Sequence, residues 1–402
     1  MRLTGHRYTP DLLCRLVTLA GQLPSAACAA TAVNTAANVP ISGRHIQRLT
    51  REVGTDLAHV RDAQAAQQRR RQLKQRVAEA PPVAVVEGDG GRLGTRAPGV
   101  GPGVQQPQAK EDKVAFLLSM RSATHAADPQ PEPPPAFRDH PRVARLVRQI
   151  KAQSAPPAHA APVVEPAAAE PLPAGKRRGQ PERLVRTCVA SMHSSDAFGP
   201  LVAAEAQTRA FFDAPRQAFV GDGQQYTWSI QRAYFPHFEP IADFLHVLCY
   251  LYPAAWAVQP EAAAHGQQYE TWMTACWKGR VSAVVAELAV WQERLGRPPP
   301  EAAALDPRQL VQEALTYLTN NASRMDYPRY RRQGLPVTCS WVESLVGEFN
   351  ARVMGWDKWW NRGAGAEAIL QVRAAVLSED DRLARYFSER PGNPYRRHRQ
   401  TN

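Results

Sequence analysis

The chain has 402 residues, of which 44% are hydrophobic, so it is long enough to bury a sizeable core and to contain more than one structural unit. Its formal net charge of +12 favours a polyanionic partner, although charge alone does not separate nucleic acid from an anionic membrane surface. There is no CxxC pair, no apolar run of membrane-spanning length and no apolar signal-peptide core, which argues against a zinc ribbon, a disulfide framework and a membrane protein and predicts a cytoplasmic one.

The first 80 residues have the periodicity of helices. One apolar run extends from Pro10 to Leu23, an alanine-rich run follows from Ser25, and Pro40 interrupts it. Ser42 has the character of an N-cap for a further helix. That helix would carry a basic and amide-bearing face, formed by Arg44, Gln47, Arg48 and Arg51. The pattern predicts a DNA-binding helix-turn-helix, or else an ordinary helical hairpin with a solvated basic face.

Strand-like segments begin at residue 83. Residues 83–92 form an apolar, β-branched run that ends at Asp89 and two glycines, and residues 93–96 and 113–120 are predicted as a second and third strand. Two later runs, 185–192 and 214–221, are also strand-like, and the last leads into Asp222 and Gly223. Residues 123–182 are rich in proline and alanine, which predicts a disordered insertion with one short basic helix at 141–151.

Helical periodicity dominates the second half. Helices are predicted at 196–210, 243–257, 272–295, 307–321 and 340–353. Asp243 and His246 stand three residues apart at the start of the second of these helices. In the last one, Glu343 lies off an apolar stripe that includes Phe349 and Val353.

These segments predict seven regions. In chain order they are a helix-turn-helix-like region (1–80), the first part of an α/β core (81–122), the Pro/Ala-rich insertion (123–182), the second part of the core (183–257), a helical insertion (258–335), a catalytic helix with the last part of the core (336–390), and a basic tail (391–402).

The order of the acidic residues suggests a metal site. Aspartates follow two strands and a glutamate lies on a late helix, so Asp89, Asp222 and Glu343 can converge in a folded core. Hard carboxylate oxygens suit Mg²⁺ or Mn²⁺, and the lack of clustered Cys and His argues against zinc. Two such ions would serve an in-line phosphoryl displacement.

The surrounding motifs resemble a known family. The chain resembles bacterial insertion-sequence transposases of the ISKra type, in the RNase H-like DDE superfamily that includes Mutator-like transposases, over residues 81–122 and about 185–385. The resemblance is carried by Asp89-Gly-Gly-Arg, Asp222-Gly with Trp228, Tyr234-Phe-Pro, Asp243-x-x-His246, Tyr327-Pro, Gly334-Leu-Pro, Trp341-Val-Glu343-Ser and the run from Gly363 to Arg373.

The resemblance implies a fold and a site. The fold would be α/β, with an RNase H-like mixed sheet flanked by helices and a helical insertion before the last catalytic helix. Asp89 on the first strand, Asp222 just after the fourth and Glu343 on the late helix would form the catalytic triad and bind two Mg²⁺ or Mn²⁺ ions. Asp243 and His246 would form an accessory motif; the alternative is a helix N-cap and a buried, hydrogen-bonded histidine.

Several further residues are candidates for DNA contact, with a solvated surface as the alternative: Arg92, Arg329, Arg331, Arg332 and Arg352. Three tryptophans, Trp356, Trp359 and Trp360, lie beside basic residues, where they would either stack on an unpaired base or pack in the core.

The sequence therefore predicts a DNA transposase that cleaves and rejoins phosphodiester bonds at transposon ends. Water would be the nucleophile for cleavage and a 3′-hydroxyl the nucleophile for strand transfer. Its partners would be double-stranded DNA and further copies of itself assembled on DNA, in association with the nucleoid. Two alternatives stay open: a catalytically silent DNA-binding protein derived from such an element, motivated by departures such as Thr338-Cys339-Ser340 and Met354, and an RNase H-like nuclease without strand transfer.

Overall fold

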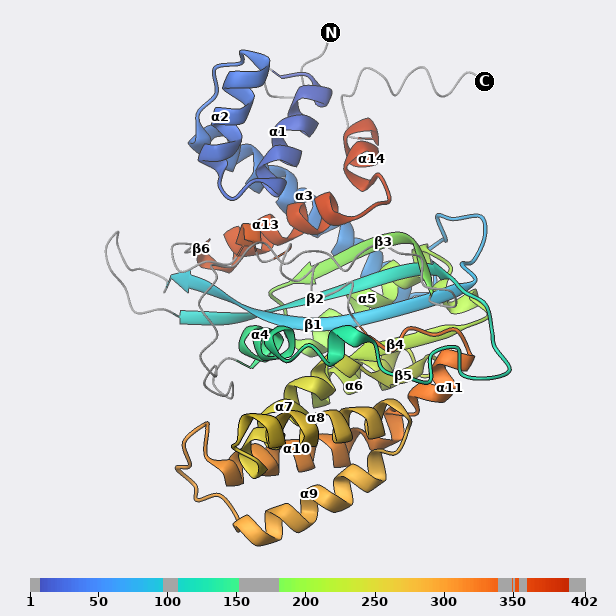
Figure 1. Cartoon of the computed structure of the whole chain (residues 1–402). Helices are drawn as coiled ribbons and strands as arrows, with labels where there is room; N and C mark the ends of the chain where they lie inside the picture. Colours follow the sequence, from blue (N-terminus) through green and yellow to red (C-terminus); the bar gives the residue numbers. More distant parts are fainter. Residues whose placement is uncertain are drawn as a thin grey trace.

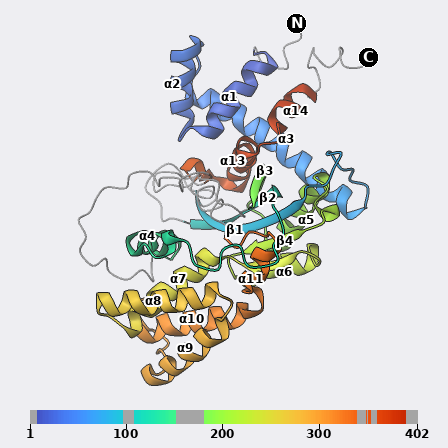
Figure 2. The same cartoon turned by 45° about the vertical axis from the view of Figure 1, so that its right-hand side comes forward.

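A computed structural model describes residues 8–96, 108–151, 181–338, 349, 351–353 and 360–389. The elements form three tiers (Figures 1 and 2). A mixed β-sheet occupies the middle, helices from both ends of the chain lie above it in Figure 1, and a block of helices from residues 244–321 lies below it.

The central sheet has the strand order β3-β2-β1-β4-β5. Its strands are β1 (Val83–Arg96), β2 (Gln108–Arg121), β3 (Glu182–Ser191), β4 (Gln217–Gly221) and β5 (Glu239–Ala242). Strand β2 runs antiparallel to β1 and β3, whereas β1, β4 and β5 are mutually parallel. A two-residue strand, β6 (Trp360–Asn361), pairs with the far end of β1. The expected mixed sheet flanked by helices is therefore present.

The strand boundaries correct two expectations. Residues 93–96 are not a separate strand, because β1 continues to Arg96 and pairs with β2 throughout. Strand β5 was not predicted, because it has only four residues and one of them is Pro240, so it shows no alternating pattern.

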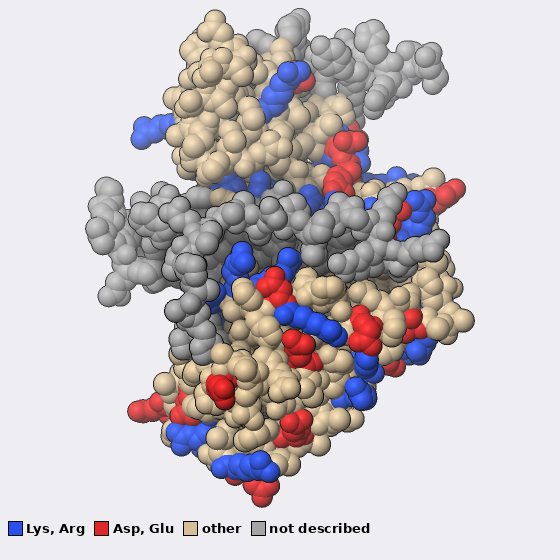
Figure 3. Space-filling model, viewed as in Figure 1, with Lys and Arg blue, Asp and Glu red and all other residues tan. Residues whose placement is uncertain are grey.

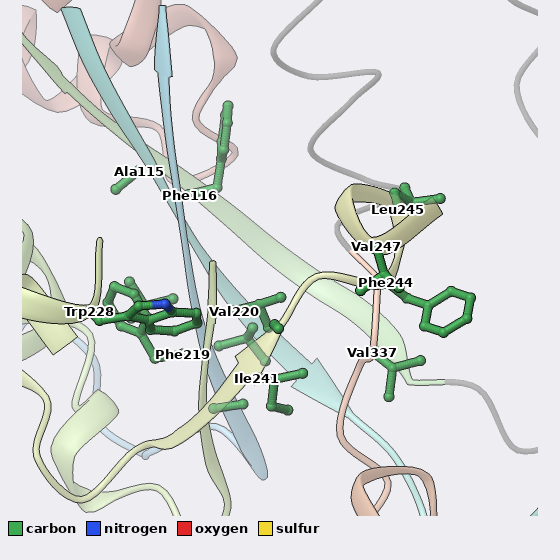
Figure 4. Packing of buried hydrophobic residues seen from close by; sticks show 14 of the residues in the cluster. Ala115, Phe116, Phe219, Val220, Trp228, Ile241, Phe244, Leu245, Val247 and Val337 are labelled. Carbon is green, nitrogen blue, oxygen red and sulfur yellow. The ribbon is translucent and has the colours of Figure 1, made fainter. Parts of the chain in front are cut away.

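Helices from the two connections after β3 and β4 cover one face of the sheet. They are α5 (Ser195–Thr208) and α6 (Gln225–Tyr234). Side chains of both helices line a small apolar cavity together with Val86, Gly88 and Phe219 of the strands. Trp228 of α6 lies beside Phe219 in this layer (Figure 4).

The lower block begins directly after β5. It contains α7 (Phe244–Val258), α8 (Ala262–Trp277), α9 (Val281–Leu295) and α10 (Pro307–Asn321), and it continues into η4 (Ala322–Arg324) and α11 (Tyr327–Arg332). Fully buried aromatic residues, including Tyr269, Trp272 and Trp277, join this block to the main core. Residues 258–335, which were predicted as a helical insertion, are therefore largely helical.

The N-terminal helices share a core with the C-terminal ones. They are α1 (Pro10–Gln22), α2 (Ala26–Ala37) and α3 (Gly43–Arg69), and the Ser42 side chain caps α3 as expected. Their apolar cluster includes Val372 and Ala375 of α13 (Arg362–Leu377) and Leu383 and Phe387 of α14 (Arg382–Glu389). The first 80 residues therefore depend on residues 362–389 for part of their core.

The first half of the Pro/Ala-rich segment is folded. Within residues 123–151, η1 (Pro135–Phe137) and the predicted basic helix α4 (His140–Ile150) are formed. Val143 and Val147 are buried, and the ring of Phe137 stacks on Phe244 of α7 at 5.5 Å. The expected disorder is wrong for this half, because apolar side chains spaced along α4 reach a partner helix; residues 152–180 lie outside the described part.

Two surface properties bear on partners. None of the helices in the described ranges is both long and apolar enough to cross a membrane. On the face shown in Figure 3, basic and acidic side chains are interspersed over the lower helical block. The net charge of +12 is therefore not gathered into one patch on that part of the surface.

Candidate active site

Three aspartates occupy equivalent positions in the register of three neighbouring parallel strands, at the carboxyl edge where β4 and β5 end and β1 continues to Arg96. Gly88 of β1 pairs with Gly221 of β4, which pairs with Ala242 of β5. The next residue along each strand is an aspartate: Asp89, Asp222 and Asp243. In the sheet, β2 and β3 lie on one side of β1, and β4 and β5 lie on the other side. The strand order therefore changes direction between β1 and β4, and ligands commonly bind at the carboxyl edge beside such a switch point.

Asp222 is held by its own turn. Its Oδ1 accepts hydrogen bonds from the Gln224 backbone N–H at 3.0 Å and from the Thr227 hydroxyl at 2.9 Å. The residue is only 5% exposed, and it forms no ion pair with any described residue. Both neutral donors bind Oδ1. The other oxygen of this nearly buried carboxylate, Oδ2, is therefore the atom that could bind a cationic ligand.

Asp243 and His246 form a local pair. Asp243 is fully buried, and its Oδ1 accepts a hydrogen bond from the Leu245 N–H as the N-cap of α7. His246 Nδ1 lies 2.7 Å from Asp243 Oδ2. Of the two structural alternatives for these residues, the N-cap is present, and His246 is hydrogen-bonded but only partly buried. The backbone N–H of Asp243 also bonds to Gly221 O at 2.9 Å, so the pair lies beside the Asp222 turn.

A fourth carboxylate, Glu87, was missed in the sequence. It lies on β1 two residues before Asp89, is 0% exposed and has no hydrogen-bond partner on either oxygen among the described residues. Burial raises the pKa of Glu87 well above its ordinary value, and the negative charge of Asp243 raises it further. The sequence does contain an indication of this residue, because Glu87 is an acidic residue within an apolar strand. The pattern pointed instead to Asp89, which is followed by two glycines.

The lower helical block closes on the Asp222 turn. Tyr317 of α10 packs against Gly223, and a Cβ added there would lie 2.3 Å from the Tyr317 ring. Asn321, one turn later, accepts a 2.8 Å hydrogen bond from the Trp228 indole. The Tyr317 hydroxyl is buried without a partner among the described residues. Burial raises its pKa well above the ordinary value, with smaller contributions from Asp243 and Asp222 among others.

The structure brings some of the predicted site residues together and leaves others undescribed. Asp222, Asp243 and His246 are adjacent, and the backbone of Asp89 is next to them in register. Glu343 lies outside the described residues. The described chain that leads to it reaches Val337, whose carbonyl accepts a 3.0 Å hydrogen bond from Phe244 beside Asp243 (Figure 4).

The residues fit a hard divalent cation in their chemistry. Carboxylate oxygens are the ligands that Mg²⁺ and Mn²⁺ prefer, and Asp222 is buried with no basic partner among the described residues. No group of three or more His, Cys, Asp and Glu side chains within the described part is arranged to hold a metal ion. A full ligand set would therefore also need residues outside it.

The predicted DNA contacts fall into two groups. Exposed on the first turns of α3 are Arg44, Gln47, Arg48 and Arg51. Arg329 is partly exposed and paired with Glu239 at 2.8 Å, and Arg332 is partly buried. Arg92 belongs to β1, and Trp360 of β6 bonds to the Val353 carbonyl; Trp356 and Trp359 lie outside the described residues.

Arg331 and Arg352 are corrections. Arg331 is 6% exposed, binds Asp128 through two hydrogen bonds and stacks on Trp277. Arg352 is also 6% exposed and donates to Ala20 O at 2.7 Å, and burial lowers its pKa to about 10. Both guanidinium groups bind protein atoms in the interior, so neither is retained as a phosphate contact.

Two sequence comparisons identify no relative of this chain. No protein-family model matches the sequence. A search of curated proteins also finds no match. A functional assignment for this chain therefore rests on its motifs and on the register of Asp89, Asp222 and Asp243.

Proposed function

We propose that the protein is a DDE-type DNA transposase with an RNase H-like core, which cleaves and rejoins DNA phosphodiester bonds. The observation that carries the proposal is the register at the carboxyl edge. Asp89 and Asp222 directly follow the paired residues Gly88 and Gly221 on neighbouring parallel strands. Residues from segments more than a hundred positions apart are thus adjacent at one edge, as a shared carboxylate site requires.

Other features agree with this assignment. Asp89 lies in the first strand and Asp222 directly after the fourth. A helical block separates β5 from the segment that contains Glu343, and the described residues at 349 and 351–353 are helical. Phe349 and Val353 are fully buried, as the apolar stripe beside Glu343 predicts.

The proposed roles follow from these positions. Asp89, Asp222 and Glu343 would hold two Mg²⁺ or Mn²⁺ ions. Such ions, when bound, activate an attacking oxygen and stabilise the leaving oxygen of an in-line phosphoryl transfer. The Thr227 hydroxyl and the Gln224 N–H both bind Asp222 Oδ1 and hold the carboxylate in one orientation. The Asp243–His246 pair fixes the start of α7 beside this turn.

The test combines chemistry with ion binding. The variants Asp89→Asn, Asp222→Asn and Glu343→Gln should each lose nicking of supercoiled plasmid and joining of a short duplex with a free 3′-hydroxyl, in Mg²⁺ or Mn²⁺. They should also bind Mn²⁺ more weakly by electron paramagnetic resonance, while binding DNA normally. Glu293→Gln, an exposed acid on α9, is the control.

Three results would discriminate between the functions. Wild-type cleavage that survives all three substitutions would overturn the proposal. Nicking without joining would favour an RNase H-like nuclease. Tight DNA binding with neither activity in the wild-type protein would favour a silent DNA-binding protein derived from a transposase.

A further inference from the structure

Two arginines lie around one tryptophan beside the Asp222 turn. The Arg324 guanidinium of η4 stacks over the Trp228 ring, 4.6 Å from its centroid. Arg232 lies one helical turn after Trp228 on α6 and therefore on the same side of that helix. The indole in turn packs on Gly221, where an added Cβ would lie 3.1 Å from Trp228 Cη2. One aromatic ring thus separates the arginines from the residue that precedes Asp222.

The two positive charges have no acidic counterpart in the described part of the chain. Arg232 contacts the Ser229 hydroxyl at 3.3 Å, and Arg324 donates to the Asn320 carbonyl at 3.1 Å. Burial lowers the pKa of Arg324, and the charge of nearby Arg232 lowers it further. Two close guanidinium groups repel one another, and a bound anion would relieve that repulsion.

Two neighbouring arginines differ from Arg324 in having acidic partners. Arg329, five residues after Arg324, pairs with both Glu239 and Asp326. Arg331 pairs with Asp128. The Arg329 pairs lie at the surface and the Arg331 pair in the interior, whereas neither Arg232 nor Arg324 forms an ion pair with a described residue.

The platform under Arg324 is rigid. Trp228 is 4% exposed, and its indole N–H bonds to Asn321 Oδ1 on α10, three residues before Arg324 in the chain. The same hydrogen bond joins α6 to the lower helical block. The Arg324 guanidinium lies over this fixed ring, and the planar fork of its N–H donors suits the oxygens of a phosphate.

We propose that Arg232 and Arg324 together bind one backbone phosphate of a DNA strand that passes the carboxyl edge at Asp222. The proposal rests on the proposed function for the identity of the nucleic acid, and it adds a binding site formed jointly by α6 and the lower helical block. The contact between α6 and α10 would then position the DNA strand relative to the carboxylates at Asp222 and its neighbours.

The test measures DNA binding separately from catalysis. Fluorescence anisotropy with a short labelled duplex would be recorded over a salt series in EDTA, so that metal-dependent cleavage does not occur. The variant with both Arg232→Gln and Arg324→Gln should bind about tenfold more weakly, and its salt slope should fall by about 1, the contribution of roughly one phosphate contact. Because both arginines would hold the same phosphate, each single variant should by itself show most of the weakening seen in the double variant.

The matched control is Arg294→Gln. Arg294 also stacks on a tryptophan, Trp291, at 5.1 Å, but it lies on α9 in the lower block. Its loss should leave affinity and salt slope unchanged. Arg324→Lys keeps the charge without the planar fork and should recover only part of the affinity.

The outcomes separate the two proposals. Wild-type affinity and salt slope in the double variant would overturn the phosphate site and leave the catalytic proposal to its own test. An equal loss in Arg294→Gln would also overturn it, because the effect would then be general charge. A selective loss in the double variant supports the site even if the wild-type protein shows no cleavage.

Discussion

The ring of Tyr317 lies directly against Gly223, on the turn that carries Asp222. Gly223 has a φ of +93°, and a Cβ there would lie 2.3 Å from Tyr317 Cε2 and 2.9 Å from Cζ. The turn therefore needs glycine for two reasons, its left-handed backbone and the approach of α10. The helical block is in this way packed onto the candidate site itself.

This contact predicts that Gly223→Ala is strongly destabilising. Forcing Ala into positive φ costs about 1–2 kcal/mol, and displacing Tyr317 adds about 1–3 kcal/mol of overpacking. Gly279→Ala is the control, because Gly279 has φ +73° but its nearest Cβ neighbour is the Pro328 ring at 3.3 Å. Urea unfolding of both variants separates the two contributions. Equal losses of unfolding free energy would show that Tyr317 yields without cost.

The Tyr317 hydroxyl, which has no hydrogen-bond partner among the described residues, predicts that Tyr317→Phe does not weaken the fold. Removing a buried hydroxyl without a partner is neutral or stabilises the protein by up to about 1 kcal/mol. Tyr327→Phe should instead lose about 1 kcal/mol, because the Tyr327 hydroxyl donates to Ala242 O at 2.9 Å. Thermal and urea unfolding compare the pair. A loss in Tyr317→Phe as large as in Tyr327→Phe would contradict the expectation.

Asp380 predicts an acid-sensitive attachment of the C-terminal helices. It accepts hydrogen bonds from Arg382 at 2.7 and 2.9 Å and lies 3.9 Å from Arg209 at the end of α5. Burial alone would raise the pKa of Asp380, but the hydrogen bond and positive charge of Arg382 outweigh it and hold the pKa below 3.8. Asp380→Asn should therefore lower the free energy of unfolding at neutral pH by about 2–4 kcal/mol.

The sign of its pH dependence follows from that lowered pKa. The stabilisation by Asp380 is fully present above its unfolded value of about 3.8 and is lost as pH falls through the folded-state pKa. The difference between wild type and Asp380→Asn should therefore shrink below about pH 4. Asp381→Asn, an exposed neighbour with φ 53°, is the control and should show little change at either pH.

The exposed face of α3 predicts a sequence-independent contribution to DNA binding. Arg44, Arg48 and Arg51 are spaced so that they share one side of the helix. Replacing any one by Gln should weaken binding and lower the salt slope by about 1 if it contacts a phosphate. Arg15→Gln is the control, since Arg15 is exposed on α1 and paired with Asp11. Salt slopes that match the wild type in all three variants would show a merely solvated face.

Local patterns anticipated much of the fold. The apolar runs at 83–92 and 214–221 predicted the cores of β1 and β4, and the limits 307–321 coincide with α10. The short strand β5 and the ten-residue helix α6 were missed; β5 has only four residues, one of them proline. Residues 123–182 were assigned to a disordered insertion from their composition, with one short helix at 141–151; that helix is present as α4, and its Val143 and Val147 pack into the core.

The sequence alone was enough to indicate the candidate residues and the segments that carry them: Asp89 in β1, Asp222 directly after β4, and the Ser42 cap before the basic turns of α3. These features depend on near neighbours in the chain. The tertiary structure was needed to show that Asp243 is in register with Asp89 and Asp222, that Glu87 is buried nearby without a hydrogen-bond partner among the described residues, and that Arg331 and Arg352 are buried. Strand register and burial arise from packing between distant segments, and a local pattern does not contain that information.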